Sequence, residues 1–564
     1  MDPREQIIAA VGVFLLLFVI YCIYHNRKRK KKILAKVRKN WGQRPEREYL
    51  TEEFEALTHY FKRNRDRKES VIDDITWNDL EMDTIFMLIN QTHSSIGEAY
   101  LYSMLRTPEF SEEKLKERDR LVEFFATHER ERERLAVLLE DIGRTGRYSI
   151  FDHVYDLADF RKGSKWIHYL GFLFLAVAIG VTVVWPEYGI LAIIGAISYS
   201  WTTYYFQRKK IEPYVISCVS VLRMLKMADR FTQVRIPEIK EYQKQISEAK
   251  RRFSKFKRNT LFVTVGGFGK NGGGIEETII MYSNFTFHID LLQFSVLVRE
   301  MNKNLAAFDL MVESIGELES ALAIASFRTL MSEHCKPHLD ISKESYLKVE
   351  EVYHPMIKEP VKNSITAPRG ALITGSNASG KSTFLKTVAI NAILAQTIYT
   401  CMADSYSGSY HQIYSSMALT DNLEKMESYY IVEIKSLKRI LDSISGKYPI
   451  LCFVDEVLRG TNTVERIAAS SQILKSMART DVMCFAATHD IELTHMLAED
   501  YDNFHFQEEV VENDILFNYQ LYEGRATSRN AIKLLGIIGY QEEIIQNAEI
   551  TATRFMETGE WELC

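Results

Sequence analysis

Residues Gly375-Ser-Asn-Ala-Ser-Gly-Lys-Ser382 read G-x-x-x-x-G-K-S, the pattern of a phosphate-binding loop. The apolar run Gly370–Thr374 precedes the loop and a helical pattern starts at Thr383, so the order strand, loop, helix that the motif requires is present. Glycines let consecutive backbone N–H groups converge on a phosphate, and the N-terminus of the following helix adds partial positive charge. The stretch therefore predicts a nucleotide site in an α/β fold. A glycine-bearing turn that matches by chance is the alternative.

The motif also assigns roles to its side chains. Lys381 is expected to reach the β- and γ-phosphates of ATP, and the Ser382 hydroxyl is expected to bind Mg²⁺. The other residues expected to surround the phosphates are Gly375, Ser376, Asn377, Ala378, Ser379, Gly380 and Thr383.

Two further apolar runs end in residues suited to phosphate chemistry. Ile450–Val454 ends in Asp455 and Glu456, which predicts a buried parallel strand with two carboxylates at its tip. Asp455 is expected to hold Mg²⁺, and Glu456 to polarise the attacking water. Val482–Ala487 leads to His489, which can sense the γ-phosphate, or else is a polar residue at a surface turn. Three strands with such carboxyl ends predict the ligand crevice of an open α/β sheet and an ATPase.

These segments resemble the MutS family of DNA mismatch-repair ATPases. The similar stretches are Thr374–Thr383, Asp455–Thr463, Ala487–Thr494, Tyr353–Ile357 and Glu523–Ile537. The resemblance implies a P-loop ATPase domain of the ABC type over 346–564, with ATP and Mg²⁺ as cofactors. It also implies that the ring of Tyr519 lies against adenine, for which packing on the sheet face is the alternative.

The segment Asp421–Glu433 resembles the family's signature loop, in which a serine reaches the γ-phosphate bound to the opposite subunit. By resemblance, Ser428 takes that role, and the chain forms a homodimer with composite ATP sites. Met426 and Glu427 stand where the family has a glycine and an arginine. The alternative for Ser428 is an N-cap of the helix that follows.

Upstream segments are similar to the family's helical core domain. They are Ile72–Glu81, Asn90–Gly97 and Arg118–Val122. We expect this core in two parts, over 41–165 and 207–345, with the second part acting as a lever. The residues ahead of the core leave no room for the family's mismatch-recognition domain, so we expect that domain to be lacking.

The N-terminal segment predicts a membrane anchor over 1–40. Ile7–Tyr24 contains 18 residues without a charge, and a basic stretch from Arg27 to Lys39 follows it. A cleavable signal peptide carries its positive charge before the apolar run instead. The alternative is a basic arm that binds nucleic acid behind a buried helix.

A second apolar region predicts a transmembrane hairpin over 166–206. Trp166–Trp185 and Gly189–Phe206 are separated by three residues, and both flanks are basic. With the anchor, this gives three transmembrane helices in a multi-pass cell-membrane protein. Its N-terminus lies outside, its ATPase domain is cytoplasmic, and it contacts membrane lipid. A buried helical hairpin in a large soluble core is the alternative.

Composition fits a multi-domain chain with α/β and all-α parts: 564 residues, 46% apolar and 26% charged. The net charge of −5 means that any nucleic-acid surface must be local. Seven cysteines show no metal-ligand spacing.

We therefore expect a membrane-anchored ATPase. Resemblance implies that it couples ATP hydrolysis to mismatched, branched or otherwise distorted DNA, as in mismatch repair. One alternative is a membrane switch that acts on a protein or lipid partner without DNA. Another is a scaffold with a silent nucleotide site, against which the presence of Lys381 and Glu456 argues.

Overall fold

The computed structural model describes residues 3–157, 166–254, 282–342, 344–376, 379–417, 429–444, 446–511, 514–526, 532, 535, 539–559 and 561. The chain forms two compact units. Unit 1 comprises 1–67, 88–103 and 118–330, and unit 2 comprises 68–87, 104–117 and 331–564.

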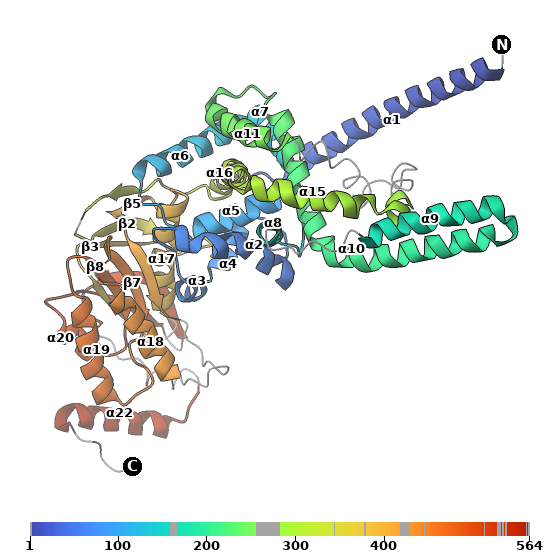
Figure 1. Ribbon diagram of the computed structural model, residues 1–564. Helices are drawn as coiled ribbons and strands as arrows, with labels where there is room; N and C mark the ends of the chain where they lie inside the picture. Colours follow the sequence, from blue (N-terminus) through green and yellow to red (C-terminus); the bar gives the residue numbers. More distant parts are fainter. Residues whose placement is uncertain are drawn as a thin grey trace. The chain divides into compact units, whose positions relative to one another are not determined.

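Unit 1 is helical (Figure 1). Its helices are α1 (Pro3–Asn40), α2 (Thr51–Asn64), α7 (Glu129–Glu140), α8 (Ile150–Asp156), α9 (Trp166–Val184), α10 (Pro186–Phe231), α11 (Lys240–Arg252), α15 (Ile289–Lys303) and α16 (Leu305–Leu330). Three helices cross the unit boundaries along the chain: α4 (Met82–Ile89), α5 (Ser95–Leu105) and α6 (Glu112–Thr127).

Helix α16 forms the core of unit 1 and packs against α7 and α11. It is buried along most of its length, since apolar residues such as Phe308, Ile315 and Phe327 face its neighbours. Gly316 allows a close approach, because a Cβ at this position would overlap the ring of Tyr100 on α5. A glycine in the middle of α16 thus lets two helices touch.

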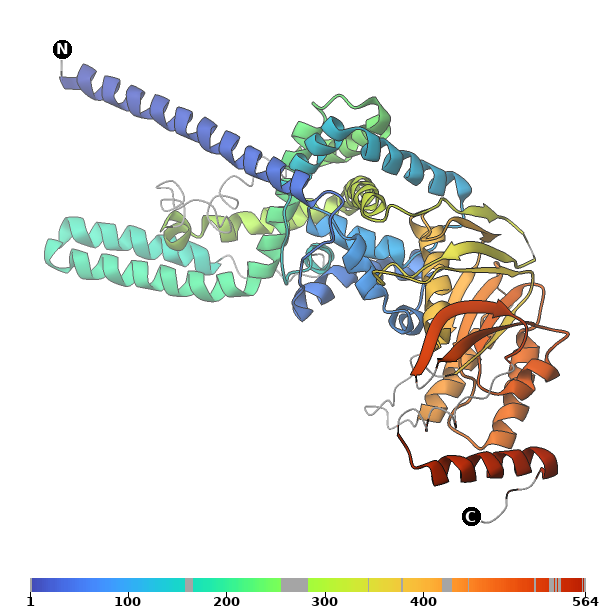
Figure 2. The same ribbon diagram turned by 180° about the vertical axis from the view of Figure 1, so that it is seen from behind.

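Unit 2 contains two sheets (Figure 2). The six-stranded sheet has the order β10 (Asp514–Glu523), β9 (Asp502–Val511), β4 (Ala371–Thr374), β8 (Val482–Ala487), β7 (Ile450–Asp455) and β6 (Gln412–Ser416). The four-stranded sheet has the order β1 (His338–Asp340), β5 (Ser405–Ser409), β2 (Leu347–Val352) and β3 (Asn363–Ala367). The helices of this unit include α3 (Asp74–Asp79), α17 (Lys381–Thr397), α18 (Tyr429–Asp442), α19 (Thr463–Met477), α20 (Ile491–Met496) and α22 (Glu542–Thr558). The expected mixed α/β architecture is present.

The central strands β4, β8 and β7 are parallel and almost wholly buried, which explains their unbroken apolar sequences. Their register places Asp455 opposite Ala487, and Ala487 opposite Ile373. The carboxyl ends of the three strands therefore meet at one edge of the sheet, as the sequence predicts.

The prediction of three transmembrane helices is wrong, and so is the prediction of a multi-pass membrane localisation. Among the residues that the structure describes, no helix is both long and apolar enough to cross a membrane. Most side chains of Ile7–Tyr24, and those of 166–168, lie outside the described residues. The second run of the expected hairpin is the first part of α10, which continues through Arg208 into the core of unit 1. Arg208 pairs there with the buried Asp290.

Candidate nucleotide-binding site

The phosphate-binding loop joins β4 to α17, and its glycines have backbone angles that other residues rarely adopt. The φ angles are 146° at Gly375 and 104° at Gly380. A Cβ on Gly375 would lie 2.8 Å from the Oγ of Ser379, so the loop cannot close around a larger residue. The predicted loop residues Asn377 and Ala378 lie outside the described residues.

Lys381 is the first residue of α17, and its side chain folds back over the loop. Its Nζ donates hydrogen bonds to the carbonyl oxygens of Gly375, at 2.8 Å, and Ser376, at 2.7 Å. Burial lowers the pKa of Lys381, while the nearby carboxylates of Glu456 and Asp455 act in the opposite direction. A bound phosphate would give this buried cation a further partner of opposite charge.

Glu456 directly follows β7 in a left-handed backbone conformation, with φ of 58°. One carboxylate oxygen lies 2.9 Å from Nε2 of His489, and the other lies 2.5 Å from Nε of Arg459. Burial raises the pKa of Glu456, but His489, Arg459 and Lys381 together outweigh it and hold that pKa below its ordinary value. The carboxylate is therefore ionised at neutral pH and can accept a proton or a hydrogen bond from water.

Asp455 and Ser382 fit a Mg²⁺ ion. Oδ1 of Asp455 is buried and has no hydrogen-bond partner among the described residues, so it has a free lone pair. Ser382 lies on the wall of the cavity beside the loop. A carboxylate and a hydroxyl oxygen are the kind of ligands that Mg²⁺ prefers.

A cavity of about 810 Å³ lies beside the loop, and Asp455 is not among the residues that line it. The sequence-predicted residues that line it are Ser376, Gly380, Lys381, Ser382, Thr383, Glu456, His489 and Tyr519. The ring of Tyr519 is beside the loop, because a Cβ on Gly380 would lie 3.2 Å from its Cδ1. Its stacking on adenine remains a prediction. Ser428 lies outside the described residues, so its role also remains a prediction.

Three polar residues of this site had no assigned role in the sequence analysis. Arg459 lines the cavity and pairs with Glu456. Glu433 of α18 accepts the backbone N–H groups of Leu458, at 2.6 Å, and Arg459, at 3.3 Å, and burial raises its pKa. Glu508 of β9 accepts a hydrogen bond of 2.6 Å from the Ser376 hydroxyl. The spacing of Arg459, three residues after Glu456, could have been noticed, but nothing local marks Glu433 or Glu508.

Comparison with known proteins finds similarity to MutS proteins in the region that contains this site. Residues 371–556 match the family profile described as MutS domain V. MutS protein homolog 4 of Homo sapiens is 27% identical over 287 residues, covering 48% of this chain and 30% of that protein. The DNA mismatch repair protein MutS of Clostridium kluyveri is 27% identical over 290 residues, covering 49% of this chain and 33% of that protein.

The chain thus spans about a third of the length of these relatives. The matches support the resemblance to MutS proteins through the ATPase domain. The absence of a mismatch-recognition domain remains a prediction.

Proposed function

We propose that this chain hydrolyses ATP with Mg²⁺ at the cavity of unit 2, and that the hydrolysis cycle serves an action on mismatched or distorted DNA. The observation that carries the ATPase is the convergence of Lys381, Glu456 and His489 on one cavity beside the loop. These side chains come from three places in the sequence and include both a phosphate-binding cation and an ionised carboxylate.

Each of these side chains has a separate role in the proposed hydrolysis. Lys381 leaves the loop carbonyls and donates to the β- and γ-phosphate oxygens. Glu456 orients the attacking water and accepts its proton, and its hydrogen bond to His489 fixes the direction of the carboxylate. The same Nε2 atom of His489 also lies 3.4 Å from Nζ of Lys381, so the histidine lies next to both the base and the phosphate-binding cation.

Ser382 and Asp455 would hold Mg²⁺ beside the phosphates. The ion, when bound, neutralises negative charge on the phosphate oxygens. Arg459 adds a cation on the same wall and keeps Glu456 in place through their ion pair.

The DNA part of the proposal rests on the printed function of the Clostridium kluyveri relative, a DNA mismatch repair protein. ATP turnover by the purified chain is measured alone, with a matched duplex and with a duplex of the same length containing one mismatch. We expect the rate to change more with the mismatched duplex. A rate that neither duplex changes would remove DNA from the proposal and leave the ATPase standing.

Composite sites in a homodimer are a further part of the proposal, supported by the likeness of the loop around Ser428 to the family's loop. Mixing Ser428→Ala chains with Lys381→Ala chains places one intact Lys381 and one intact Ser428 at the same site. We expect the mixture to recover turnover that neither variant shows alone. If heterodimers form and the mixture stays inactive, Ser428 does not act across the dimer.

A further inference from the structure

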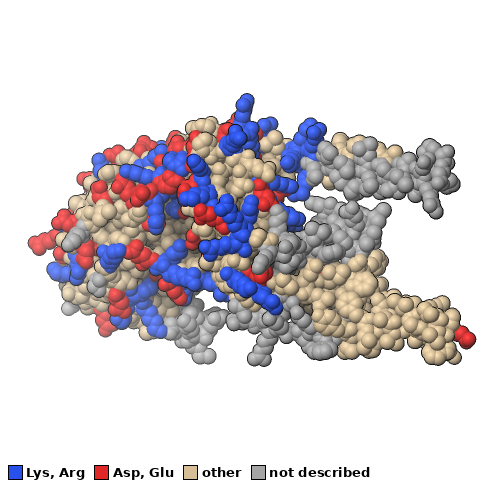
Figure 3. All heavy atoms as spheres, turned by 45° about the horizontal axis from the view of Figure 1, so that its top comes forward, with Lys and Arg blue, Asp and Glu red and all other residues tan. Residues whose placement is uncertain are grey.

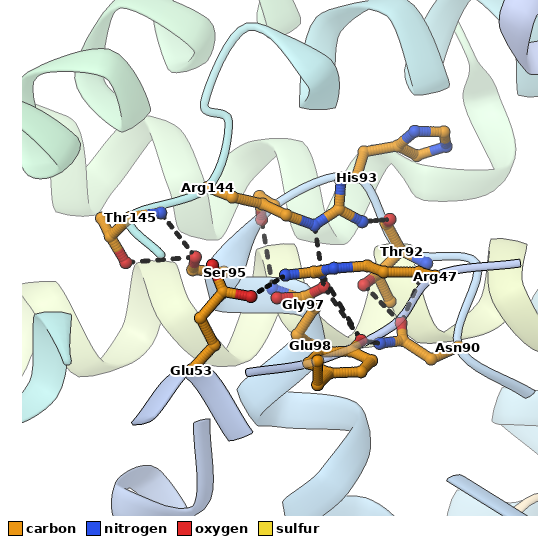
Figure 4. Close-up of polar contacts among 12 residues, drawn as sticks. Arg47, Glu53, Asn90, Thr92, His93, Ser95, Gly97, Glu98, Arg144 and Thr145 are labelled. Carbon is orange, nitrogen blue, oxygen red and sulfur yellow. Dashed lines mark hydrogen bonds and ion pairs between the residues drawn. The ribbon is translucent and has the colours of Figure 1, made fainter. Parts of the chain in front are cut away.

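Unit 1 contains a second large cavity, which we call the unit-1 cavity. Its volume is about 820 Å³, close to the 810 Å³ of the nucleotide-binding cavity. Its walls come from the end of α1, the segment 41–47, the loop 90–93, α7 and α16. Figure 4 shows the polar contacts along one of these walls.

Positive side chains predominate on these walls. The lysines and arginines that line the cavity are Lys36, Lys39, Arg44, Arg47, Arg132 and Arg144. The carboxylates that line it are Glu46 and Glu140. On the molecular face in Figure 3, lysine and arginine are intermingled with aspartate and glutamate. Among the residues that line the cavity, cations therefore outnumber carboxylates.

Arg47 and Arg144 depend on one buried carboxylate (Figure 4). Nε of Arg144 donates to Oε1 of Glu98 at 2.8 Å, and Arg47 donates to the same oxygen. Burial lowers the pKa of Arg47, and the neighbouring charge of Arg144 lowers it further. Tyr49 and Glu53 act in the opposite direction on this pKa, and the Glu53 carboxylate lies 3.6 Å from Arg47.

The positive side chains around the cavity also affect the pKa of Glu140. Burial raises its pKa, but His93, Lys36 and Arg144 outweigh this and hold the pKa of Glu140 at about 2. Its oxygens lie 3.2 Å from Nδ1 of His93 and 3.3 Å from Nζ of Lys36. A carboxylate so strongly stabilised indicates a positive potential along this wall.

Trp41 and Arg132 add a flat surface to the cavity. The Arg132 guanidinium carbon lies 3.9 Å from the centre of the Trp41 ring, and burial lowers the pKa of Arg132. Stacked guanidinium and indole groups can accommodate both a phosphate and a planar ring.

Hydrogen bonds between distant parts of unit 1 fix the segments that line the cavity. The Gly42 N–H donates to the Ser326 hydroxyl at 2.9 Å, and that hydroxyl donates to Gln91 at 2.9 Å. Glu319 on α16 accepts the N–H groups of His93, at 2.8 Å, and Ser94, at 3.1 Å. The segment 41–47 and the loop 90–93 are both fixed to α16, so the cavity is built into the fold.

We propose that the unit-1 cavity binds a multiply phosphorylated small molecule of nucleotide size. The volume matches that of the nucleotide-binding cavity. Six cations line the unit-1 cavity, against Glu46 and Glu140 on its walls and Glu98 behind them, and this excess favours an anion of more than one charge. Lys381 in unit 2 offers a comparison within the molecule, because it is also a partly buried cation whose pKa burial lowers. The ligand site is independent of the proposed ATPase, since none of its residues belongs to unit 2.

Titration calorimetry with inorganic tripolyphosphate tests the proposal on the full chain. We expect two sites per chain in the unaltered protein and one in Lys381→Ala, because that substitution removes the cation beside the phosphate-binding loop and leaves the unit-1 cavity unchanged. In the Lys381→Ala background, Lys39→Glu is expected to weaken the remaining site about 10-fold through the loss of a charge-assisted contact. Lys32→Glu is the matched control, since Lys32 is an exposed residue of α1 outside the cavity and makes the same change of charge.

Three results would overturn the proposal. If Lys381→Ala binds no tripolyphosphate, the second site does not exist. If Lys39→Glu and Lys32→Glu weaken tripolyphosphate binding equally, the second site is not the unit-1 cavity. Displacement of tripolyphosphate by a DNA duplex that binds the same site more tightly would make the cavity a nucleic-acid contact. Arg132→Glu provides a second cavity variant, and circular dichroism of each variant establishes that it is folded.

Discussion

The two cavities have nearly the same volume, but the chain builds them in different ways. The nucleotide-binding cavity depends on backbone groups of one continuous loop, completed by residues at two strand ends. The unit-1 cavity depends on side chains that extend from Lys36 to Ser326 in the sequence. A site formed by backbone and glycine leaves a motif in the sequence. A site formed by charged side chains from distant segments leaves none.

The two cavities also differ in what they can do. In unit 2, Lys381 and the ionised Glu456 line the same cavity, and Oδ1 of Asp455 is buried without a hydrogen-bond partner among the described residues. In unit 1, Glu140 on the cavity wall and Glu98 behind it are already engaged by arginine, lysine or histidine. The first arrangement is the one that we propose for hydrolysis, and the second is the one that we propose for binding alone.

The largest effect is expected from Lys381→Ala, which removes the cation that we propose contacts the phosphates. We expect ATP turnover to fall by about 1,000-fold, as for loss of a charged group that stabilises the transition state. Steady-state phosphate release measures it, with Lys39→Glu in the unit-1 cavity as a variant of unchanged rate. A rate equally reduced by Lys39→Glu would mean that the two cavities are not independent.

Glu456→Gln separates binding from hydrolysis at the same site. The amide keeps the shape of the side chain but cannot accept a proton, so we expect kcat to fall by about 100-fold while ATP affinity is retained. Single-turnover kinetics and equilibrium binding of ATP measure the two quantities. Glu492→Gln on α20, an exposed carboxylate outside the cavity, should leave both unchanged. Normal turnover by Glu456→Gln would exclude this residue as the base.

Glu98→Gln tests how the wall of the unit-1 cavity is held. Glu98 is buried and pairs with both Arg47 and Arg144, so its loss leaves two guanidinium groups without their shared carboxylate. We expect the local free energy of opening around α5 to fall by about 3 kcal/mol. Hydrogen exchange of peptides from the Ser95–Leu105 helix measures it, and peptides from α17 serve as the internal control. Unchanged exchange in α5 would show that the pairing contributes little.

The smallest effect is a pH shift at the nucleotide-binding site. His489 helps to hold the pKa of Glu456 down, so His489→Ala should raise that pKa. Because Glu456 acts in its ionised form, a higher pKa moves the acid limb of the pH profile of kcat/KM to higher pH. His338→Ala is the control, since that exposed histidine lies on β1 outside the cavity. An acid limb that stays in place, or moves to lower pH, would contradict this coupling.

Regions outside the motif show where sequence reasoning reaches its limit. Gly189–Phe206 is apolar enough locally to suggest a transmembrane helix, but the sequence does not show that the same helix runs on to Phe231. The packing of the later part of α10, where Val215 and Leu222 are buried, is decided by contacts with other helices. Hydropathy measures how apolar a segment is, and it does not show which other helices the segment packs against.

The sequence by itself determined the phosphate-binding loop, the two carboxylates at the end of β7, and the three parallel strands whose ends meet beside them. These features depend on local backbone geometry and on uninterrupted apolar runs, both of which are written in consecutive residues. Only the tertiary structure decided that Glu433 supports the turn after Glu456, and that cations from α1, the segment 41–47, α7 and the position of Arg144 line one cavity in unit 1. Such contacts join residues far apart in the chain, and their energies depend on burial and on neighbouring charges that no local pattern records.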